Sequence, residues 1–173
     1  MRRRWQYWIP ALFLTAGAVW MSPVLAQPDG VPFWRGGQYS DILISHLPNA
    51  IWLREALARW HQVPLWNPLI LSGAPFAADP LSGMWYPPNW LAMVLPATLA
   101  FNLLFWIHLA WGGYGLYRLL RAEGVGAAGA LLGGLLFSGT PKWVGHIGLG
   151  HLGLVSAVGW TPWCLLAVRG MVG

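Results

Sequence analysis

The chain has 173 residues, of which 57% are hydrophobic and only 9% are charged. Soluble domains usually carry about 25% charged residues. This composition therefore excludes a soluble globular domain, a disordered segment and a disulfide scaffold, and it leaves an integral membrane protein. The net charge of +5 comes from scattered basic residues, too few to follow a nucleic-acid backbone, so we expect no nucleic-acid partner. The single cysteine, Cys164, excludes an internal disulfide.

Charge-free runs of sequence locate four predicted transmembrane helices. The first run covers 5–28, and the later spans are expected at about 96–117, 125–138 and 151–168, because a helix needs roughly 20 apolar residues to cross a bilayer. A further run, 60–78, contains prolines, which cannot donate the hydrogen bonds that a helix in lipid requires. We therefore expect an all-α integral membrane protein with a long external first loop.

This pattern divides the chain into a signal-anchor helix (1–26), an external loop with amphipathic and interfacial helices (27–95) and a three-helix transmembrane segment (96–173). Basic residues favour one orientation, because the cytoplasmic ends of spans carry an excess of them. With the N-terminus in the cytoplasm, six arginines fall on that side: Arg2, Arg3, Arg4, Arg118, Arg121 and Arg169. The long loop and a short turn around Lys142 are then external.

The first span has two interpretations. Its arginine-rich start and apolar core, followed by Val24-Leu25-Ala26, resemble a signal peptide with a cleavage site. The apolar stretch is long for a signal peptide, and its tryptophans suit interfacial anchors. We therefore favour an uncleaved signal-anchor, and the following loop is external in both cases.

The third predicted span is rich in small residues. Gly126, Ala130 and Gly134 recur at four-residue spacing, as do Gly129 and Gly133. Such faces let helices approach closely. We expect this face to pack within the chain rather than to form a dimer.

The external loop is long for a connector, and ordered loops of this length are usually functional. Pro48 fits the first position of a helix. Apolar residues then recur on one side, which predicts an amphipathic helix on the outer membrane surface. A short interfacial helix is expected near 89–95. Of the acids in this loop, Asp41 and Asp79 have no evident structural partner, although a lone Asp before a helix is more often a cap or a solvated group than a base.

Three segments occur in a characteristic order. The first joins Tyr39-Ser40-Asp41 to Pro48 and the helix Leu53-Arg54-Glu55-Ala56-Leu57; the second comprises 63–68, 72–76 and 85–89; the third comprises 113–118, Phe137-Ser138-Gly139, Gly150-His151 and Gly159-Trp160-Thr161-Pro162. In this order and spacing, from about Tyr39 to Arg169, the chain resembles the N-terminal part of the YfhO-like bacterial membrane proteins, within the GT-C class of glycosyltransferases.

The resemblance implies a multi-pass enzyme of the bacterial cytoplasmic (inner) membrane. Such enzymes take a sugar from a polyprenyl-phosphate carrier and transfer it to an acceptor on the outer face. Their first external loop holds an essential acid, and Asp41 is the matching position, which implies a general base that removes the proton of the acceptor hydroxyl. The leaving group is a lipid phosphate, so no second carboxylate acid is required. We expect no cofactor and no metal.

Further candidate substrate-binding residues differ in the chemistry that they offer. A phosphate on the outer side is expected to meet Arg35, Lys142, His146 and His151. For Lys142, an interfacial anchor is the alternative. The spacing of His146 and His151 is poor for a metal site on a helix.

Four more residues carry open alternatives. Trp66 and Asn67 either line a sugar site, because aromatic faces stack on sugar rings, or stiffen the loop. His46 and Tyr86 complete the predicted substrate-binding set. His108 lies mid-span, where an ionisable residue is either functional or held neutral by a hydrogen bond.

The chain departs from the family in length, because family members are several times longer and carry many more spans. The paired acidic motif of some GT-C enzymes is also absent, since Asp41 is flanked by Ser40 and Ile42. We therefore expect either the N-terminal portion of such an enzyme or a non-catalytic small membrane subunit or inactive truncated derivative. The expected partners are membrane lipids, the polyprenyl-phosphate sugar, and other membrane subunits or the missing C-terminal part.

Overall fold

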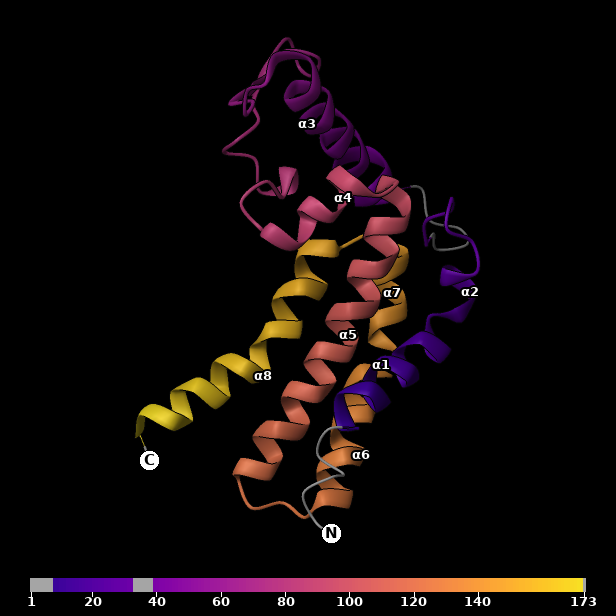
Figure 1. Cartoon of the computed structure of the whole chain (residues 1–173), viewed down its shortest axis with the longest axis vertical. Helices are drawn as coiled ribbons and strands as arrows, with labels where there is room; N and C mark the ends of the chain where they lie inside the picture. Colours follow the sequence, from indigo (N-terminus) through magenta and orange to yellow (C-terminus); the bar gives the residue numbers. More distant parts are fainter. Residues whose placement is uncertain (1–7, 33–38, 173) are drawn as a thin grey trace.

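The computed structural model describes residues 8–32 and 39–172 and is mostly helical (Figure 1). Arg2, Arg3, Arg4 and Arg35 lie outside the described residues. In chain order the elements are α1 (Ile9–Trp20), α2 (Ser22–Leu25), the π-helix η2 (Ile42–His46), α3 (Leu47–Trp60), β1 (Trp66–Asn67), β2 (Ala74–Pro75), the 3-10 helices η3 (Pro80–Ser82) and η4 (Pro87–Trp90), α4 (Leu91–Val94), α5 (Ala97–Ala122), α6 (Ala127–Ser138), α7 (Lys142–Gly148) and α8 (Leu152–Val172).

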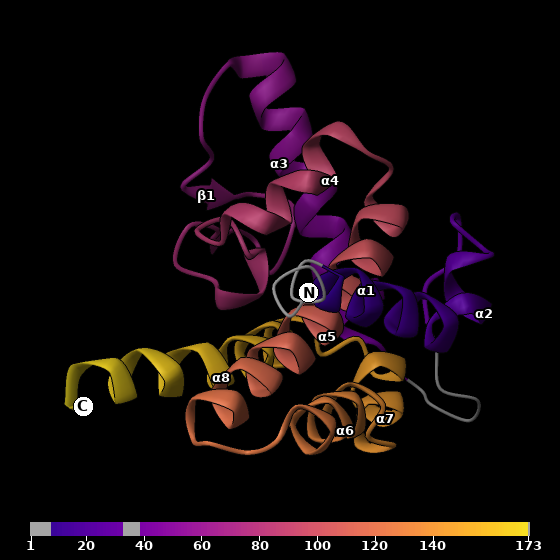
Figure 2. The same ribbon diagram turned by 60° about the horizontal axis from the view of Figure 1, so that its bottom comes forward.

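The long helix α5 is the centre of the fold. Helices α1, α6 and α8 all pack against it (Figures 1 and 2). Its buried side includes Phe101, Leu104 and Phe105, which share one core with Leu152 and Val155 of α8. This all-apolar contact follows from the near absence of charge in both helices, since apolar side chains gain most where they leave water together.

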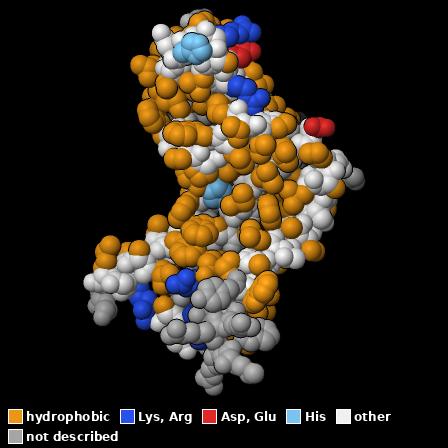
Figure 3. Space-filling model, in the orientation of Figure 1, with side chains coloured by type: hydrophobic (Ala, Val, Ile, Leu, Met, Phe, Trp, Pro, Cys, Tyr) orange, Lys and Arg blue, Asp and Glu red, His pale blue; other side chains and the backbone are white. Residues whose placement is uncertain are grey.

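Two helices, Ala97–Ala122 and Leu152–Met171, are long and apolar enough to cross a bilayer, whereas the apolar helix Ile9–Trp20 is shorter. Hydrophobic side chains cover the middle of the face in Figure 3, and basic side chains lie toward its two ends. The helical fold and two candidate spans agree with the sequence. The full count of four spans stays a prediction.

The third predicted span, 125–138, corresponds to α6, and a second helix, α7, follows it where a turn was expected. Residues 139–141 separate them, and α7 continues in the direction of α6 toward the far end of α5 (Figure 1). Pro141 has no amide hydrogen and therefore cannot continue the backbone hydrogen bonds of α6. The chain reverses later, at Gly150, which has φ of 77°. The expected turn around Lys142 is therefore wrong, because a helix break rather than a reversal occurs there, while the external location of this segment stays a prediction.

Small residues let α6 lie directly against α5, as the spacing predicted. Ala130 and Gly134 are buried in this contact. A Cβ added at Gly134 would lie 2.5 Å from the carbonyl oxygen of Gly113. The two backbones therefore approach as closely as small-residue faces allow.

We expect Gly113→Ala to lower the free energy of unfolding by about 1–3 kcal/mol. Its Cβ would lie 1.9 Å from Ser138 Oγ and 2.8 Å from the Gly134 carbonyl oxygen, and the second of these atoms is backbone. The measurement is a denaturant titration in detergent micelles. Gly153→Ala in α8 is the matched control, because nothing lies within 4 Å of its added Cβ. Equal stability of the two variants would contradict the close packing.

Residues 47–95 form a lobe beyond one end of α5 (Figure 1). Helix α3 begins where predicted, with Pro48 in its first turn. Its buried residues Trp52 and Leu53 share a core with Phe76 and Met84 of the following loop. The lobe core thus takes up part of the apolar side of α3, whereas Ile51 and Trp60 on that side are 49% and 51% exposed. The place of this helix on a membrane surface stays a prediction. The short helix α4, with η4 before it, lies in the segment 89–95 where a short helix was predicted, and its interfacial location stays a prediction.

The second half of α8 leaves the bundle (Figures 1 and 2). Pro162 lies inside this helix. Beyond it Leu165, Val168 and Met171 are 52%, 57% and 83% exposed. Arg169 pairs with Glu123, the residue that follows α5. This end of α8 is therefore an apolar surface that no other described segment covers.

Candidate functional site

Asp41 lies where the segment before η2 meets the turn between α7 and α8. Its backbone N–H donates to the carbonyl oxygen of Leu149 at 2.9 Å. Gly150 lies so close that an added Cβ would be 2.9 Å from the Asp41 nitrogen. The Asp41 side chain is 35% exposed. The carboxylate is therefore anchored through its backbone and still reachable by a ligand.

Two imidazoles continue from the Asp41 carboxylate. His151 Nε2 lies 3.8 Å from Asp41 Oδ2, and the Nδ1 atoms of His151 and His146 lie 3.0 Å apart. A contact between two such nitrogens needs a hydrogen on one of them. Which of the two nitrogens donates depends on the tautomers of the two rings. Asp41, His151 and His146 therefore form one polar chain.

His46 is buried close to this chain. Its side chain is 6% exposed, and its ring centroid lies 6.2 Å from that of Phe101. Burial lowers the pKa of His46, and the charge of Asp41, a hydrogen bond with the Leu81 backbone and the charge of Asp79 oppose this only in part. His46 is therefore neutral at neutral pH, and its burial favours a structural role over contact with a substrate.

Acid is expected to destabilise the protein through His46. As the pH falls below 6.5, the ordinary pKa of histidine, His46 takes up a proton in the unfolded chain before it does so in the folded protein. The reason is that burial lowers the folded-state pKa of His46. Stability therefore falls as the pH falls toward that lowered pKa, by at most about 1.4 kcal/mol per pH unit. We expect His46→Asn to lose less stability than the natural protein between about pH 7.5 and about pH 5.5, measured by denaturant titration.

The control for this prediction is His61→Asn. His61 is exposed at the end of α3 with φ of 53°, and Asn tolerates that backbone conformation. This variant should keep the natural pH dependence. Parallel curves for the natural protein and His46→Asn would contradict the assignment.

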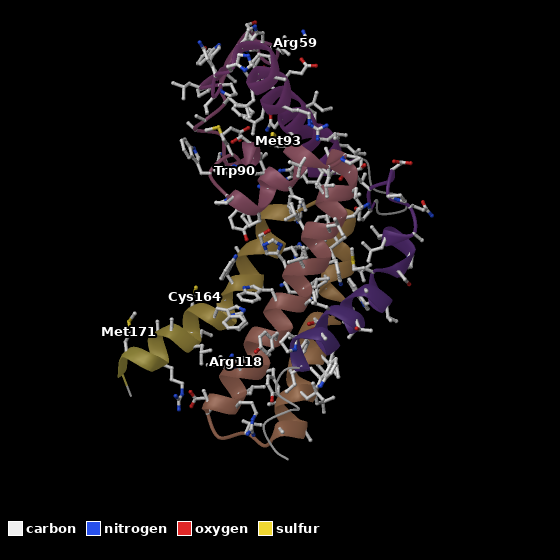
Figure 4. The ribbon with its side chains drawn as sticks, viewed as in Figure 1. Arg59, Trp90, Met93, Arg118, Cys164 and Met171 are labelled. Carbon is white, nitrogen blue, oxygen red and sulfur yellow. The ribbon has the colours of Figure 1, made fainter. Side chains whose placement is uncertain are left out.

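A separate apolar cavity of about 470 Å³ lies between the lobe and the bundle. The face in Figure 3 is indented between the lobe and α8, and Trp90, labelled in Figure 4, belongs to the lining. One polar group of three residues stands in its wall. Tyr86 Oη lies 2.5 Å from His108 Nε2 and accepts a hydrogen bond from Trp160 Nε1 at 2.7 Å. An apolar hollow with a few convergent polar groups is the usual form of a ligand site.

Comparison with known proteins gives no indication of function. No family model, no curated protein and no solved structure matches this chain. Within residues 8–32 and 39–172, no three His, Cys, Asp or Glu side chains gather in a way that could hold a metal ion.

The structure divides the predicted site residues between different places. Asp41, His46, His146 and His151 lie together. Lys142 shares a second cavity, of about 340 Å³, with His146, and Tyr86 belongs to the larger apolar cavity. Arg35 lies outside the described residues.

Trp66 and Asn67 lie in the small hairpin of the lobe, where Trp66 pairs with Pro75 and Asn67 with Ala74. The Asn67 side chain is 4% exposed, and its Oδ1 accepts from the Leu69 N–H at 2.9 Å. The Trp66 ring covers Gly73, where an added Cβ would lie 2.5 Å from Trp66 Nε1. These contacts favour the interpretation of a stiff loop.

Sequence reasoning missed Trp160 and left His108 open. The one signal for His108 was its mid-span position, since an ionisable residue there needs a partner. One partner is the Leu104 carbonyl oxygen of the preceding turn, and a second partner, Tyr86, comes from the lobe. Asp79, by contrast, accepts from the Leu81 N–H at 2.8 Å and from Asn49 Nδ2 at 3.3 Å. It therefore caps η3.

Proposed function

We propose that this chain corresponds to the N-terminal portion of a membrane glycosyltransferase of the GT-C kind. It transfers a sugar from a polyprenyl-phosphate carrier to an acceptor on the outer face of the bacterial cytoplasmic membrane. The observation that carries the proposal is the placement of Asp41. It is a half-exposed carboxylate at the junction of lobe and bundle, with His151 Nε2 at 3.8 Å.

The chemistry assigned to Asp41 is that of a general base. Its carboxylate accepts the proton of the acceptor hydroxyl while that oxygen attacks the anomeric carbon. The bond from this carbon to the phosphate oxygen breaks, and the lipid phosphate leaves with the electron pair. A general base must lie within hydrogen-bond reach of the proton that it takes. The anchored backbone and partial exposure of Asp41 support this role.

The arrangement of charges supports the proposed orientation. Arg118, Arg121 and Arg169 belong to the ends of α5 and α8 remote from the lobe (Figure 4 labels Arg118). A cytoplasmic location of this end follows the positive-inside rule. It places Asp41 and the lobe on the outer face, where the acceptor and the sugar of the carrier are expected to meet.

The test is a transfer assay on the longest native form of the protein in its own membranes. The probe is a labelled polyprenyl-phosphate sugar, and the measured quantity is the rate of sugar release from the carrier. We expect Asp41→Asn to lower this rate by about 100-fold or more, with an unchanged amount of protein in the membrane. Asp29→Asn, the same change at an exposed turn, should keep the full rate. Full activity of Asp41→Asn would overturn the base assignment.

A second candidate function is a non-catalytic subunit of a larger membrane complex. The observation that favours it is the uncovered second half of α8, where Val168 and Met171 are 57% and 83% exposed. Packing against partner helices would stabilise such a helix. Sugar release that is absent from the natural protein, together with a stable membrane partner that co-purifies with it, would favour this alternative.

A further inference from the structure

The break between α6 and α7 lies beside the middle of the bundle. Ser138, the last residue of α6, donates its hydroxyl hydrogen to the carbonyl oxygen of Leu109, halfway along α5, at 2.9 Å. Helix α7 then continues for 7 residues to the turn at Gly150. At 1.5 Å per residue this helix covers about 10 Å. Lys142, the first residue of α7, therefore lies about 10 Å from the level of Asp41, toward the middle of the bundle.

Lys142 stands at a cavity with mostly apolar walls. The cavity has a volume of about 340 Å³, and Phe137, Leu154 and Val158 contribute to its walls. The Lys142 side chain is exposed. None of the ion pairs among the described residues involves it, and it is the single lysine of the chain. A full positive charge thus stands at the edge of an apolar hollow without a protein counter-ion among the described residues.

The other polar groups of the cavity do not supply a negative charge. The Thr140 hydroxyl donates to the carbonyl oxygen of Leu136 at 2.7 Å. His146 contacts His151 through Nδ1, which leaves its Nε2 available at the cavity. An anion that pairs with Lys142 would therefore come from outside the described residues.

A bilayer supplies such an anion together with an apolar chain. A lysine in a span extends its methylene stem along apolar surface and brings its ammonium group to the headgroup level. A lipid phosphate there meets the charge, while the acyl chain of the same lipid covers the apolar walls. The charge count favours a phosphodiester, because its single negative charge matches one lysine, whereas a phosphomonoester carries about −1.5 to −2.

We propose that Lys142 binds the phosphate of an anionic phosphodiester lipid of the outer leaflet, with the acyl chain against Phe137, Leu154 and Val158. The outer-leaflet location rests on the orientation given with the proposed function, and the polyprenyl-phosphate sugar is itself a phosphodiester, but the occupant proposed here is a bilayer phospholipid. Its test uses no transfer activity, so that either proposal can fail alone.

The test is lipid binding to the full chain in detergent, followed by native mass spectrometry with phosphatidylglycerol as the probe. We expect Lys142→Gln to weaken binding about fivefold, the effect of one lysine near a charged membrane surface. Arg59→Gln is the matched control, because Arg59 is also exposed but lies in the lobe beside Glu55. It should bind as the natural protein does. Equal binding by Lys142→Gln and Arg59→Gln would overturn the proposal.

Further arms separate the sources of phosphate. Displacement of phosphatidylglycerol by millimolar inorganic phosphate would overturn the lipid assignment in favour of a free-anion site. Binding of phosphatidic acid or a polyprenyl phosphate at least tenfold tighter than phosphatidylglycerol would overturn the phosphodiester assignment in favour of a monoester.

Because Lys142 is the single lysine, its acetylation in the natural protein can be followed by peptide mass spectrometry. We expect phosphatidylglycerol to slow this reaction, and an unchanged rate would count against the site without any substitution.

Discussion

Replacing Gly150 by alanine is expected to lower the free energy of unfolding by about 2–5 kcal/mol, since strain of about 1–2 kcal/mol adds to overpacking of about 1–3 kcal/mol. Gly150 has φ of 77°, a conformation that costs a side chain energy wherever it occurs. Its added Cβ would also lie 2.6 Å from the Ile42 nitrogen and 2.9 Å from the Asp41 nitrogen. These are backbone atoms and cannot turn aside, so the segment that holds Asp41 must move.

Gly124→Ala separates the two contributions. Gly124 has φ of 83°, and nothing lies within 4 Å of its added Cβ. We expect this control to lose only the conformational part, about 1–2 kcal/mol. Both variants are measured by denaturant titration in the same detergent. NMR of the His151 ring should change in Gly150→Ala alone, because the contact of His151 with Asp41 depends on this turn. Equal losses in the two variants would contradict the close packing of Asp41 on the turn.

The helices could be predicted from composition because their cause is local. Helix α5 begins at Ala97, one residue beyond the predicted start, and α8 begins at Leu152. The start of α5 follows from Pro96, and the start of α8 follows the pair Gly150-His151. The interruption near Lys142 was visible as Gly139-Thr140-Pro141, but not its geometry. A break and a reversal have similar sequences, and the choice between them depends on how α6 and α7 pack against α5 and α8.

The candidate site was predictable in part. Asp41 and His151 were both selected, but no local pattern indicated that they meet, since their contact depends on how η2 packs on the turn at Gly150. His46 was selected as a substrate residue, and its side chain is instead buried against Phe101. The direction in which a short irregular segment turns its side chains depends on packing with residues far away in sequence. Such packing has no periodic signature.

The group Tyr86–His108–Trp160 is expected to hold the lobe to the bundle. His108 Nδ1 lies 2.7 Å from the Leu104 carbonyl oxygen and must carry the hydrogen of that bond. Its Nε2 therefore accepts from the Tyr86 hydroxyl, whose oxygen accepts in turn from Trp160. The three residues come from the loop before η4, from α5 and from α8. One hydroxyl thus joins three segments that are remote in sequence.

Tyr86→Phe should lower the free energy of unfolding by about 1–3 kcal/mol, because it leaves the buried Nε2 of His108 without a partner. His108 is 4% exposed, so water cannot readily replace the lost hydroxyl. Tyr39→Phe is the control, since Tyr39 is 67% exposed and should change stability little. Combining Tyr86→Phe with Trp160→Phe gives a double-mutant cycle, in which we expect the combined loss to be smaller than the sum of the single losses. Strict additivity, or a loss for Tyr86→Phe no greater than that for Tyr39→Phe, would show that this group does not join the lobe to the bundle.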